Sequence, residues 1–553
     1  MSNSDIANSF SLLAKLMEIN GENSFKAKSY SSTAFAIEKL LVQLSEIEVN
    51  EIQYLKGIGS SSAKKIEELL KTGTLIQLEE IIFSTPPGVL EMIKIKGLGP
   101  KKINTIWKEM ELESVGELLY ACKENRLKLY KGFGEKTQTA VSDYIEFYLK
   151  NKGSYLYSQT INIAEQFKQL FQNIFVKKDV FITGDFARQM EIISQLEFII
   201  NEEVNIVENT ILKIEEFQLL TKDQNELLYK TGTGINIKIY AVKENVIEKL
   251  IETSSSVSFY EALNSNAETA NSQEHYFQLR DLPYLPAFVR EDAAILTQND
   301  YLHEHLHEND IKGLIHCHSK WSDGNNTIEE MANACIEKGL EYMVISDHSK
   351  SAFYAQGLNE TQIKTQQIEI DEINSRLAPF KIFKSIESDI LNDGSLDYTN
   401  SILSTFDLVI ASVHSNLKMT EEKAMNRLLA AIENPCTTIL GHLTGRLLLS
   451  RPSYPLNFKK IIDACAANSV VIELNANPNR LDIDWREIKY ALDKNVLISV
   501  NPDAHSLKGI DDIKYGVFSA QKALLPKEKN LSSFSLQNFN DFVDSRKRIK
   551  GIL

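Results

Sequence analysis

Histidines and carboxylates gather at the ends of strand-like segments in the C-terminal half of this 553-residue chain. None of its ten histidines precedes His275. In Gly313–Ser349, two apolar runs of strand length flank a helical pattern that Thr327 can cap, which predicts a strand–helix–strand unit. Five more strand-like runs follow, so we expect seven strands. Six of the seven end at a histidine or an acidic residue, which gives nine candidates: His316, His318, Asp323, His348, Glu387, His414, His442, Asp503 and His505.

These nine side chains predict a metal site. The carboxyl ends of the strands meet at one face of a parallel βα barrel, so the nine should lie together. One histidine at a strand end is usually a core or surface residue, but six histidines and three carboxylates in register favour a site. Imidazole and carboxylate without thiolate suit two or three ions of manganese, zinc or iron, with Glu387 and Asp503 as bridges. Such ions lower the pKa of bound water to about 7 and hold phosphate oxygens, so phosphoester hydrolysis is the predicted chemistry.

The segments that carry these residues resemble the polymerase and histidinol phosphatase (PHP) domain. The matching segments are HxH, SDG, DHS, SIESDIL, SVHS, GHLTGR, ELNANPNRLD and NPDAHS. The resemblance implies a distorted seven-stranded βα barrel with a trinuclear metal site. It assigns one ion to His316, His318, Glu387 and Asp503, a second to Glu387, His414 and His442, and a third to Asp323, His348 and His505. It also places Arg446 and Arg480 where they could act as catalytic residues on substrate phosphate, and a surface ion pair is the alternative for each.

The composition limits the remaining classes of function. No stretch approaches a membrane span and the polar start is not a signal peptide, while five scattered cysteines without CxxC pairs fit a reducing cytoplasm. The net charge of −15 argues against indiscriminate binding of polyanions. Residues 1–150 are nearly neutral, however, with 19 basic and 20 acidic side chains. Contact with nucleic acid should therefore begin in that segment.

Three short repeats in that segment predict DNA binding. They are LKGIGSSSAKKI at 55–66, IKGLGPKKI at 95–103 and YKGFGEKTQTAV at 130–141, and they follow a predicted helical region at 4–45. Glycines permit a tight turn and a close backbone approach, and the N–H groups at a helix start attract an anion. The repeats resemble helix–hairpin–helix motifs, which hold the DNA backbone without reading its sequence. The candidate DNA-binding residues are Lys56, Gly57, Gly59, Lys96, Gly97, Gly99, Lys131, Gly132 and Gly134.

The order of the segments resembles the bacterial family X DNA polymerases, in which a PHP domain follows the polymerase core. GENSFKAKSY near the start and DLPYLPAFVRED at 281–292 also match that family. The resemblance implies four regions: helical helix–hairpin–helix segments at 1–150, an α+β nucleotidyltransferase-like domain at 151–290, a linker at 291–309, and the α/β PHP barrel at 310–553. Lys65 falls where related enzymes carry a lyase nucleophile that forms a Schiff base, and a solvated helix lysine is its alternative. We predict a monomer.

The middle domain departs from the pattern of that family. Its signature is Gly-Ser-x-Arg-Arg, then two aspartates one residue apart, then a third on a neighbouring strand. Here GDFAR begins at Gly184, Gln195 and Glu197 stand at the paired positions, and Lys238 stands at the third. Polymerisation needs two magnesium ions held by those carboxylates, so we predict a folded polymerase core without activity. The Ser- and Asn-rich stretch 254–273 is predicted to be a loop.

Three functions remain, together with one narrower idea. The first is a metal-dependent phosphoesterase that acts on DNA in repair, as a 3′–5′ exonuclease or a 3′-end phosphatase. The second is an active gap-filling polymerase, against which Gln195 and Lys238 count. The third is a non-catalytic scaffold that binds DNA ends, which would require broken metal ligands. Cleavage of a small ester such as histidinol phosphate is disfavoured by the fused hairpins. The histidines of YLHEHLHEND are predicted to be solvated linker residues: His303, His305 and His307.

Overall fold

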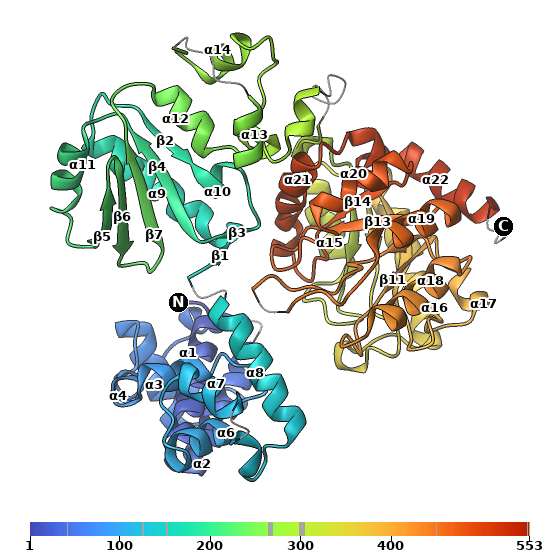
Figure 1. Ribbon diagram of the computed structural model, residues 1–553. Coiled ribbons are helices and arrows are strands. Elements are labelled where there is room, and N and C mark those ends of the chain that lie inside the picture. Colours follow the sequence, from blue (N-terminus) through green and yellow to red (C-terminus); the bar gives the residue numbers. More distant parts are fainter. Residues whose placement is uncertain are drawn as a thin grey trace. The chain divides into compact units, whose positions relative to one another are not determined.

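A computed structural model describes residues 1–40, 42–123, 126–150, 153–263, 269–297, 305–449, 451–549 and 551 (Figure 1). His303 lies outside these residues. The chain forms two compact units, Met1–Lys152 and Gly153–Leu553. Among the described helices, none is long and apolar enough to cross a membrane. The predicted boundaries at residues 290 and 309 fall inside the second unit and stay predictions.

The first unit is helical throughout its described part. The prediction of helices over 4–45 is confirmed, because two long helices cover most of that range. Apolar side chains from Ile6 to Ile145 form one core that belongs to this unit alone. The helices are α1 (Asn3–Ile19), α2 (Ser24–Glu38), α3 (Ser60–Thr72), α4 (Ile76–Ser84), α5 (Pro87–Met92), α6 (Pro100–Asn104), α7 (Val115–Lys123) and α8 (Glu135–Lys150).

The second unit begins with a mixed five-stranded sheet in the order β2-β4-β7-β6-β5. Strand β4 runs parallel to β7, and the other neighbouring strands are antiparallel. Phe171, Phe198 and Tyr229 fill the core beside this sheet. Its strands are β2 (Val180–Thr183), β4 (Gln195–Ile200), β5 (Phe217–Asp223), β6 (Glu226–Thr231) and β7 (Asn236–Ala241), and a separate pair joins β1 (Tyr155–Leu156) to β3 (Ile192–Ile193).

One prediction for this region is wrong. We expected a loop over 254–273, but the structure has a helix there, α13 (Val257–Ala262). The hydroxyl of Ser256 accepts a hydrogen bond from the Phe259 N–H and caps the helix, and the Phe259 ring is fully buried. Burial of an aromatic ring outweighs the loop-like composition. The other helices of this region are α9 (Tyr157–Ile174), α10 (Gly184–Ala187), α11 (Val204–Ile211), α12 (Val246–Thr253) and α14 (Gln273–Gln278).

The C-terminal region is a nearly closed barrel of seven parallel strands, as predicted. Each of the seven apolar runs forms one strand, because strands of a parallel sheet are covered on both faces and are apolar throughout. The residues of these strands are buried, except that Lys381 and Lys384 of β10 are half-buried. They are β8 (Gly313–Cys317), β9 (Tyr342–Ile345), β10 (Lys381–Asp389), β11 (Leu408–Ser412), β12 (Ile439–Leu440), β13 (Val471–Asn475) and β14 (Ile498–Asn501).

Helices surround this sheet (Figure 1), and the last one packs against residues of the barrel strands. As predicted, Thr327 caps the first of them, and its side chain accepts a hydrogen bond from the Glu330 N–H. Phe539 of the last helix stacks on Tyr342 in the barrel interior, with ring centroids 4.4 Å apart. The helices are α15 (Ile328–Glu337), α16 (Glu360–Leu377), α17 (Asn400–Leu403), α18 (Glu421–Glu433), α19 (Phe458–Asn468), α20 (Trp485–Asp493), α21 (Ile513–Lys522) and α22 (Leu536–Ile549).

A seam joins the first barrel strand to the last. Cys317, the last residue of β8, pairs as a parallel bridge with Ala504, which lies just beyond β14. The Ala504 N–H donates to the His316 carbonyl at 3.3 Å, and the His318 N–H donates to the Ala504 carbonyl at 2.9 Å. The barrel is therefore closed by the segments that carry predicted metal ligands.

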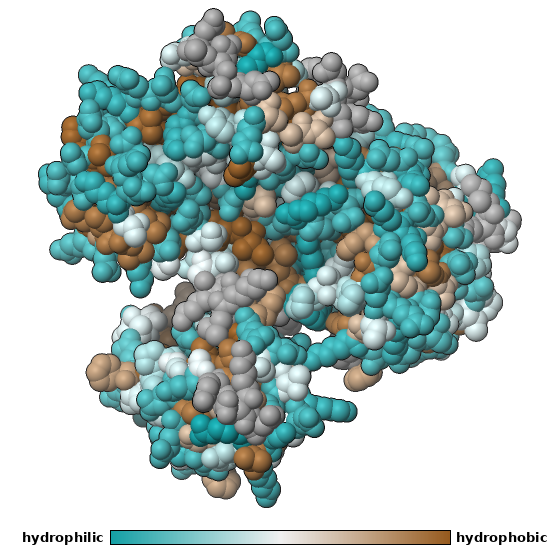
Figure 2. Space-filling view, in the orientation of Figure 1, coloured by the Kyte–Doolittle hydropathy of each residue, from teal (hydrophilic) through white to brown (hydrophobic). Residues whose placement is uncertain are grey.

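The surface is mostly hydrophilic on the face that Figure 2 shows, with small scattered apolar areas. The five cysteines are all buried and unpaired. Burial raises the pKa of the Cys335 thiol to about 12, so this thiol stays protonated. No cysteine chemistry is therefore indicated at the protein surface.

Candidate metal centre and DNA-binding surface

The nine predicted ligands lie together at the carboxyl ends of the barrel strands. Glu387, at the end of β10, is the centre of the group and is fully buried. Its two carboxylate oxygens lie within 3.7 Å of ring nitrogens of five histidines: His316, His318, His348, His414 and His442. One carboxylate is thus shared by five histidines from four strand ends, those of β8, β9, β11 and β12.

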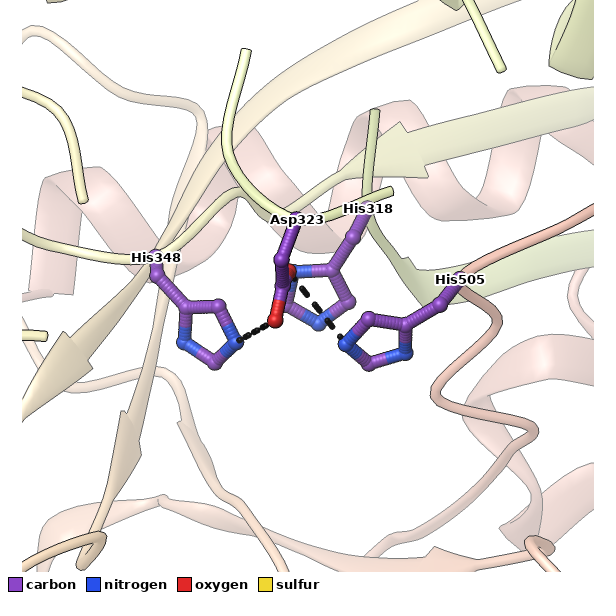
Figure 3. Close-up of side chains that lie close together, drawn as sticks. All are labelled: His318, Asp323, His348 and His505. Atoms are coloured by element: carbon purple, nitrogen blue, oxygen red, sulfur yellow. Dashed lines mark ion pairs between the residues drawn. The ribbon is translucent and has the colours of Figure 1, made fainter. Parts of the chain in front are cut away.

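The other two carboxylates complete the group. Asp503 Oδ1 lies 3.1 Å from His318 Nε2 and 3.6 Å from His316 Nε2. Asp323 lies 3.6 Å from His348 Nε2 and 3.4 Å from His505 Nε2. Figure 3 shows His318, His348 and His505 around Asp323, their rings directed toward the same space.

The donor set fits divalent metal ions. Three sets of side chains each bring ligand atoms within 4.8 Å of one another. Several buried ligand atoms have no hydrogen-bond partner, which is costly unless another group satisfies them: His316 Nε2, His318 Nδ1, His348 Nδ1, Glu387 Oε2 and His442 Nδ1. The three sets are His318, Asp323, His348 and His505; then His316, His318 and Asp503; then His348, Glu387 and His414.

The electrostatics also favour cation binding. Burial alone would raise the pKa of the Glu387 carboxyl, but the surrounding histidines outweigh it and hold that pKa well below its usual range. The pKa of Asp503 is lowered in the same way. Burial and the neighbouring histidines lower the pKa of His318 to about 3, so its imidazole stays neutral and keeps a lone pair for a metal. The site therefore offers ionised carboxylates and at least one neutral imidazole.

Two of the candidate ligands have an unusual backbone. His316 has φ +62° and Asp503 has φ +55°, in the left-handed region that few residues other than glycine adopt. Such a conformation costs about 1 to 3 kcal/mol at each position and persists where function requires it. At the seam, His316 Nε2 lies 3.3 Å from Glu387 Oε1 and 3.6 Å from Asp503 Oδ1.

Sequence reasoning missed the carboxylates that hold the ligands in place. Glu473, in the middle of β13, accepts from His316 Nδ1 at 2.6 Å and from the His442 N–H at 2.6 Å. Asp389 bonds to His414 Nδ1. Asp347 accepts from four protein donors and is not a free ligand. A charged residue inside an apolar strand, as in SVVIEL, is the signal that could have identified Glu473.

The two predicted catalytic arginines are in different situations. Arg480 is partly exposed, and its Nε lies 3.9 Å from Asp503 Oδ2. All three nitrogens of Arg446 donate to protein acceptors instead, among them Asp484 at 2.7 Å and Glu191 at 3.0 Å. Arg446 is therefore in an ion pair, the alternative considered for it, although the pair lies mostly inside the protein and not at its surface. The guanidinium of Arg480 lies beside the candidate ligands.

Of the linker histidines, His307 is exposed, but His305 is half-buried, because its ring packs on Phe288.

The three N-terminal repeats adopt the same turn. In each, the first glycine has a positive φ: +88° at Gly57, +93° at Gly97 and +92° at Gly132. The apolar residue between the two glycines is buried and closes the same backbone hydrogen bond to the residue three positions earlier. The lysines before the glycines and the second glycines are all exposed: Lys56, Lys96 and Lys131, then Gly59, Gly99 and Gly134.

Open space surrounds these turns. A Cβ on Gly59, Gly99 or Gly134 would meet no atom within 4 Å, so the backbone N–H groups beside them can be approached closely. Gly59 and Gly99 precede helices α3 and α6.

Lys65, the candidate lyase residue, is half-buried, with its Nζ 5.8 Å from the centre of the Tyr30 ring.

The middle domain brings its three signature positions to one face of the sheet. Glu197 on β4 is the direct register partner of Lys238 on β7, and Gln195 lies two residues before Glu197. Lys238 Nζ pairs with Glu226 at 2.7 Å, and Glu197 accepts from the Tyr240 hydroxyl at 2.6 Å. A Cβ on Gly184 would lie 2.5 Å from the Glu197 carboxyl, so this side chain covers the Gly184 turn.

Comparison with known proteins assigns the family. Family models match residues 1–75 (helix-hairpin-helix domain), 89–140 (SAM-like helix-hairpin-helix tandem) and 315–477 (PHP domain). A protein of Bacillus subtilis named DNA polymerase/3′-5′ exonuclease PolX is 30% identical, over 98% of this chain and 99% of its own length. The chain belongs to the PolX family.

Other relatives match only part of this PolX-family chain. A probable phosphatase of Caldanaerobacter subterraneus is 25% identical over 41% of this chain and 88% of its own length. A probable phosphatase of Escherichia coli is 25% identical over 29% of this chain and 62% of its own length. The PolX-family chain therefore joins a phosphoesterase domain to helix–hairpin–helix segments that support DNA binding.

Proposed function

We propose that this PolX-family protein hydrolyses phosphoesters at DNA 3′ ends, as a 3′–5′ exonuclease or a 3′-end phosphatase, and that it has lost polymerase activity. The observation that carries the proposal is the group of nine ligands around Glu387, with unsatisfied buried ligand atoms. Three ions in the predicted arrangement would supply water activation and charge neutralisation for phosphoester cleavage. Manganese, zinc and iron all suit these ligands.

The chain's own residues would hold and orient the DNA. Glu387, Asp503 and Asp323 bring negative charge to the floor of the site, so a phosphate approaches only when cations balance that charge. Arg480, beside Asp503, is placed to donate to a phosphate oxygen and to stabilise charge that develops on it. The exposed lysines and glycines of the hairpins would bind the DNA backbone without sequence preference.

Loss of polymerase activity is supported by the contacts of the middle domain. Gln195 brings no charge where a magnesium ligand is needed, and Lys238 brings a cation that Glu226 already pairs. Arg188, in the signature turn, pairs with Asp185 at 2.5 Å and lies 3.6 Å from Glu291, so its charge is compensated within the protein. A gap-filling polymerase, which the name of the Bacillus subtilis relative would suggest, is the second candidate.

One gel assay separates these functions. A 5′-labelled recessed primer-template is incubated with manganese, with and without nucleotides, for the natural protein, His316→Ala and the exposed control His307→Ala. We expect stepwise shortening of the primer by the natural protein and the control but not by His316→Ala. A 3′-phosphorylated primer distinguishes the two 3′-end activities, since phosphate loss changes mobility without shortening. Extension with nucleotides would show that the middle domain polymerises, and an unchanged primer in every lane would reject the proposal.

A further inference from the structure

A buried carboxylate of the middle domain reaches into the phosphoesterase region. Glu191 lies between α10 and β3 and is only 8% exposed. Its Oε1 lies 3.0 Å from Arg446 Nη2, and its Oε2 lies 3.7 Å from Arg486 Nη1. Arg446 follows the ligand His442 by four residues, so a residue 255 positions away in the sequence contacts the loop after β12.

Arg446 in turn holds a second loop, residues 477–484. Its Nε donates to the Arg480 carbonyl at 2.9 Å, its Nη1 to Asp484 at 2.7 Å, and its Nη2 to the Leu481 carbonyl. This is the loop that presents Arg480 beside Asp503. Arg446 therefore fixes the backbone on which the phosphate-binding candidate is carried.

The two loops are also tied to each other. The hydroxyl of Thr444 donates to Asp482 Oδ2 at 2.8 Å, and the Thr444 N–H donates to the same oxygen at 3.0 Å. Asp482 exchanges backbone hydrogen bonds with Asn475, whose side chain donates to Asp503 at 3.1 Å. A continuous set of contacts thus runs from Glu191 to a metal-ligand candidate.

The neighbouring contacts keep Glu191 in place. Lys522 of α21 donates to the Arg188 carbonyl at 2.7 Å and to Glu291 at 2.9 Å. The ring of Tyr157 stacks on Phe186, with centroids 4.9 Å apart, and meets Phe518 of α21 edge-on. The Tyr157 N–H donates to the Glu191 carbonyl, so the backbone at Glu191 is held as well as its side chain.

The charges explain why Glu191 matters to Arg446. Glu191 and Asp484 together balance Arg446 and Arg486; Glu191 is buried, Arg446 and Asp484 are half-buried, and Arg486 is exposed. Loss of one member of a buried pair leaves the other charge unbalanced, and the remaining groups rearrange to compensate it. Displacement of a positioning loop by about 1 Å can cost a hundredfold in rate.

We propose that Glu191 of the middle domain is a positioning residue for phosphoester cleavage, acting through Arg446 on the loop that carries Arg480. The inference rests on the proposed function of the barrel. It gives the middle domain a role that needs no nucleotide, since this domain would hold in place a loop of the phosphoesterase site.

The test compares Glu191→Gln with Glu203→Gln in the full-length protein with manganese. Glu203 pairs with the exposed Lys243 and serves as the matched control. We expect Glu191→Gln to lower kcat for primer shortening about tenfold with little change in KM, and Glu203→Gln to leave both unchanged. Because Glu191 acts through Arg446, adding Glu191→Gln to Arg446→Gln should lower kcat less than twofold further. Glu191→Asp, which retains the charge, should restore part of the rate.

A second readout does not depend on activity. Amide hydrogen exchange over residues 477–484 should become faster in Glu191→Gln and stay unchanged in Glu203→Gln. Wild-type kcat and unchanged exchange in Glu191→Gln would overturn the inference, as would additive losses in the double variant. If the natural protein shortens the primer but Glu191→Gln does so equally well, only the inference fails. If the natural protein does not act on the primer at all, the proposed function fails, and the exchange experiment still decides whether Glu191 holds the loop.

Discussion

At the scale of single residues, the site depends on buried carboxylates that are not metal-ligand candidates. Glu473 fixes the ring of His316 through Nδ1 and so directs Nε2 toward Glu387 and Asp503. It also accepts from the Asn501 amide at 2.8 Å, which satisfies the remaining capacity of a fully buried group. A hydrogen bond to one ring nitrogen sets which nitrogen remains for a metal.

Glu473→Gln should therefore weaken metal binding. We expect the affinity for manganese to fall about 10- to 100-fold, because a neutral amide neither orients the His316 ring as firmly nor increases its basicity. Titration calorimetry of metal-free protein measures this directly. Glu369→Gln is the control, since Glu369 accepts from the Trp321 indole and bonds to no histidine among the described residues. Equal affinities for the two variants would contradict the role given to Glu473.

A different carboxyl makes stability depend on pH. Burial and the adjacent Asp511 raise the pKa of Asp512 to about 6 from an ordinary value of 3.8, against the opposing effect of Lys514 and Lys508. The folded state therefore binds this proton more tightly than the unfolded state, and stability falls as pH rises from about 4 to about 6. Asp512→Asn should raise the free energy of unfolding by about 1 kcal/mol at pH 7.5, allowing for solvent screening. Near pH 4 the substitution should leave the free energy of unfolding unchanged. Urea denaturation at both pH values checks this, with exposed Asp544→Asn as control; an equal gain at pH 4 would count against it.

At the scale of elements, we propose that each of the three hairpin turns binds a DNA phosphate. Each has an exposed lysine, a first glycine with positive φ and free space at the second glycine. Combined Lys56→Ala, Lys96→Ala and Lys131→Ala should weaken DNA binding at least tenfold. The slope of log affinity against log salt should also become shallower by about two to three, since each lost phosphate contact removes about 0.9.

Fluorescence anisotropy with labelled DNA of two unrelated sequences measures this effect. The loss should be the same for both sequences, because backbone contacts carry no sequence information. Lys71→Ala is the control, since Lys71 is exposed in the same unit but pairs with Glu67 at 2.6 Å. An unchanged salt slope in the triple variant would rule out phosphate contacts at these lysines.

The helices and strands could be predicted from the sequence better than the contacts between residues that are far apart in it. Each barrel strand could be predicted because an apolar run of 4–8 residues ends at a polar residue, and that pattern is local. Helix α13 could not, since the burial of Phe259 depends on distant residues. The nine ligands lie together because parallel strand ends converge, whereas the contact of Glu191 with Arg446 spans 255 positions that no local pattern connects. Glu473 was missed because a carboxylate within an apolar strand has meaning only beside His316.

At the scale of the whole molecule, the two units have separate cores. The core of Met1–Lys152 contains no residue of the second unit. Residues 1–152 produced alone should therefore fold cooperatively and bind DNA without hydrolysing it. Residues 153–553 should retain manganese-dependent hydrolysis but bind DNA at least tenfold more weakly. Thermal unfolding and anisotropy on the two fragments check this. Failure of the first fragment to fold would show that its core depends on the second unit.

The seam of the barrel has a further consequence in polymer terms. His318 and Asp503 approach to 3.1 Å across it although 185 positions separate them. An ion held by both would act as a crosslink that closes a loop of that length. By the relation used for disulfides, such a crosslink lowers the entropy of the unfolded chain, and this raises the free energy of the unfolded state by roughly 5 kcal/mol at 25 °C. Chelation should therefore lower the melting temperature of residues 153–553 but not that of residues 1–152. A bound ion would oppose unfolding because it closes a long loop of the chain, in addition to the bonds that it makes.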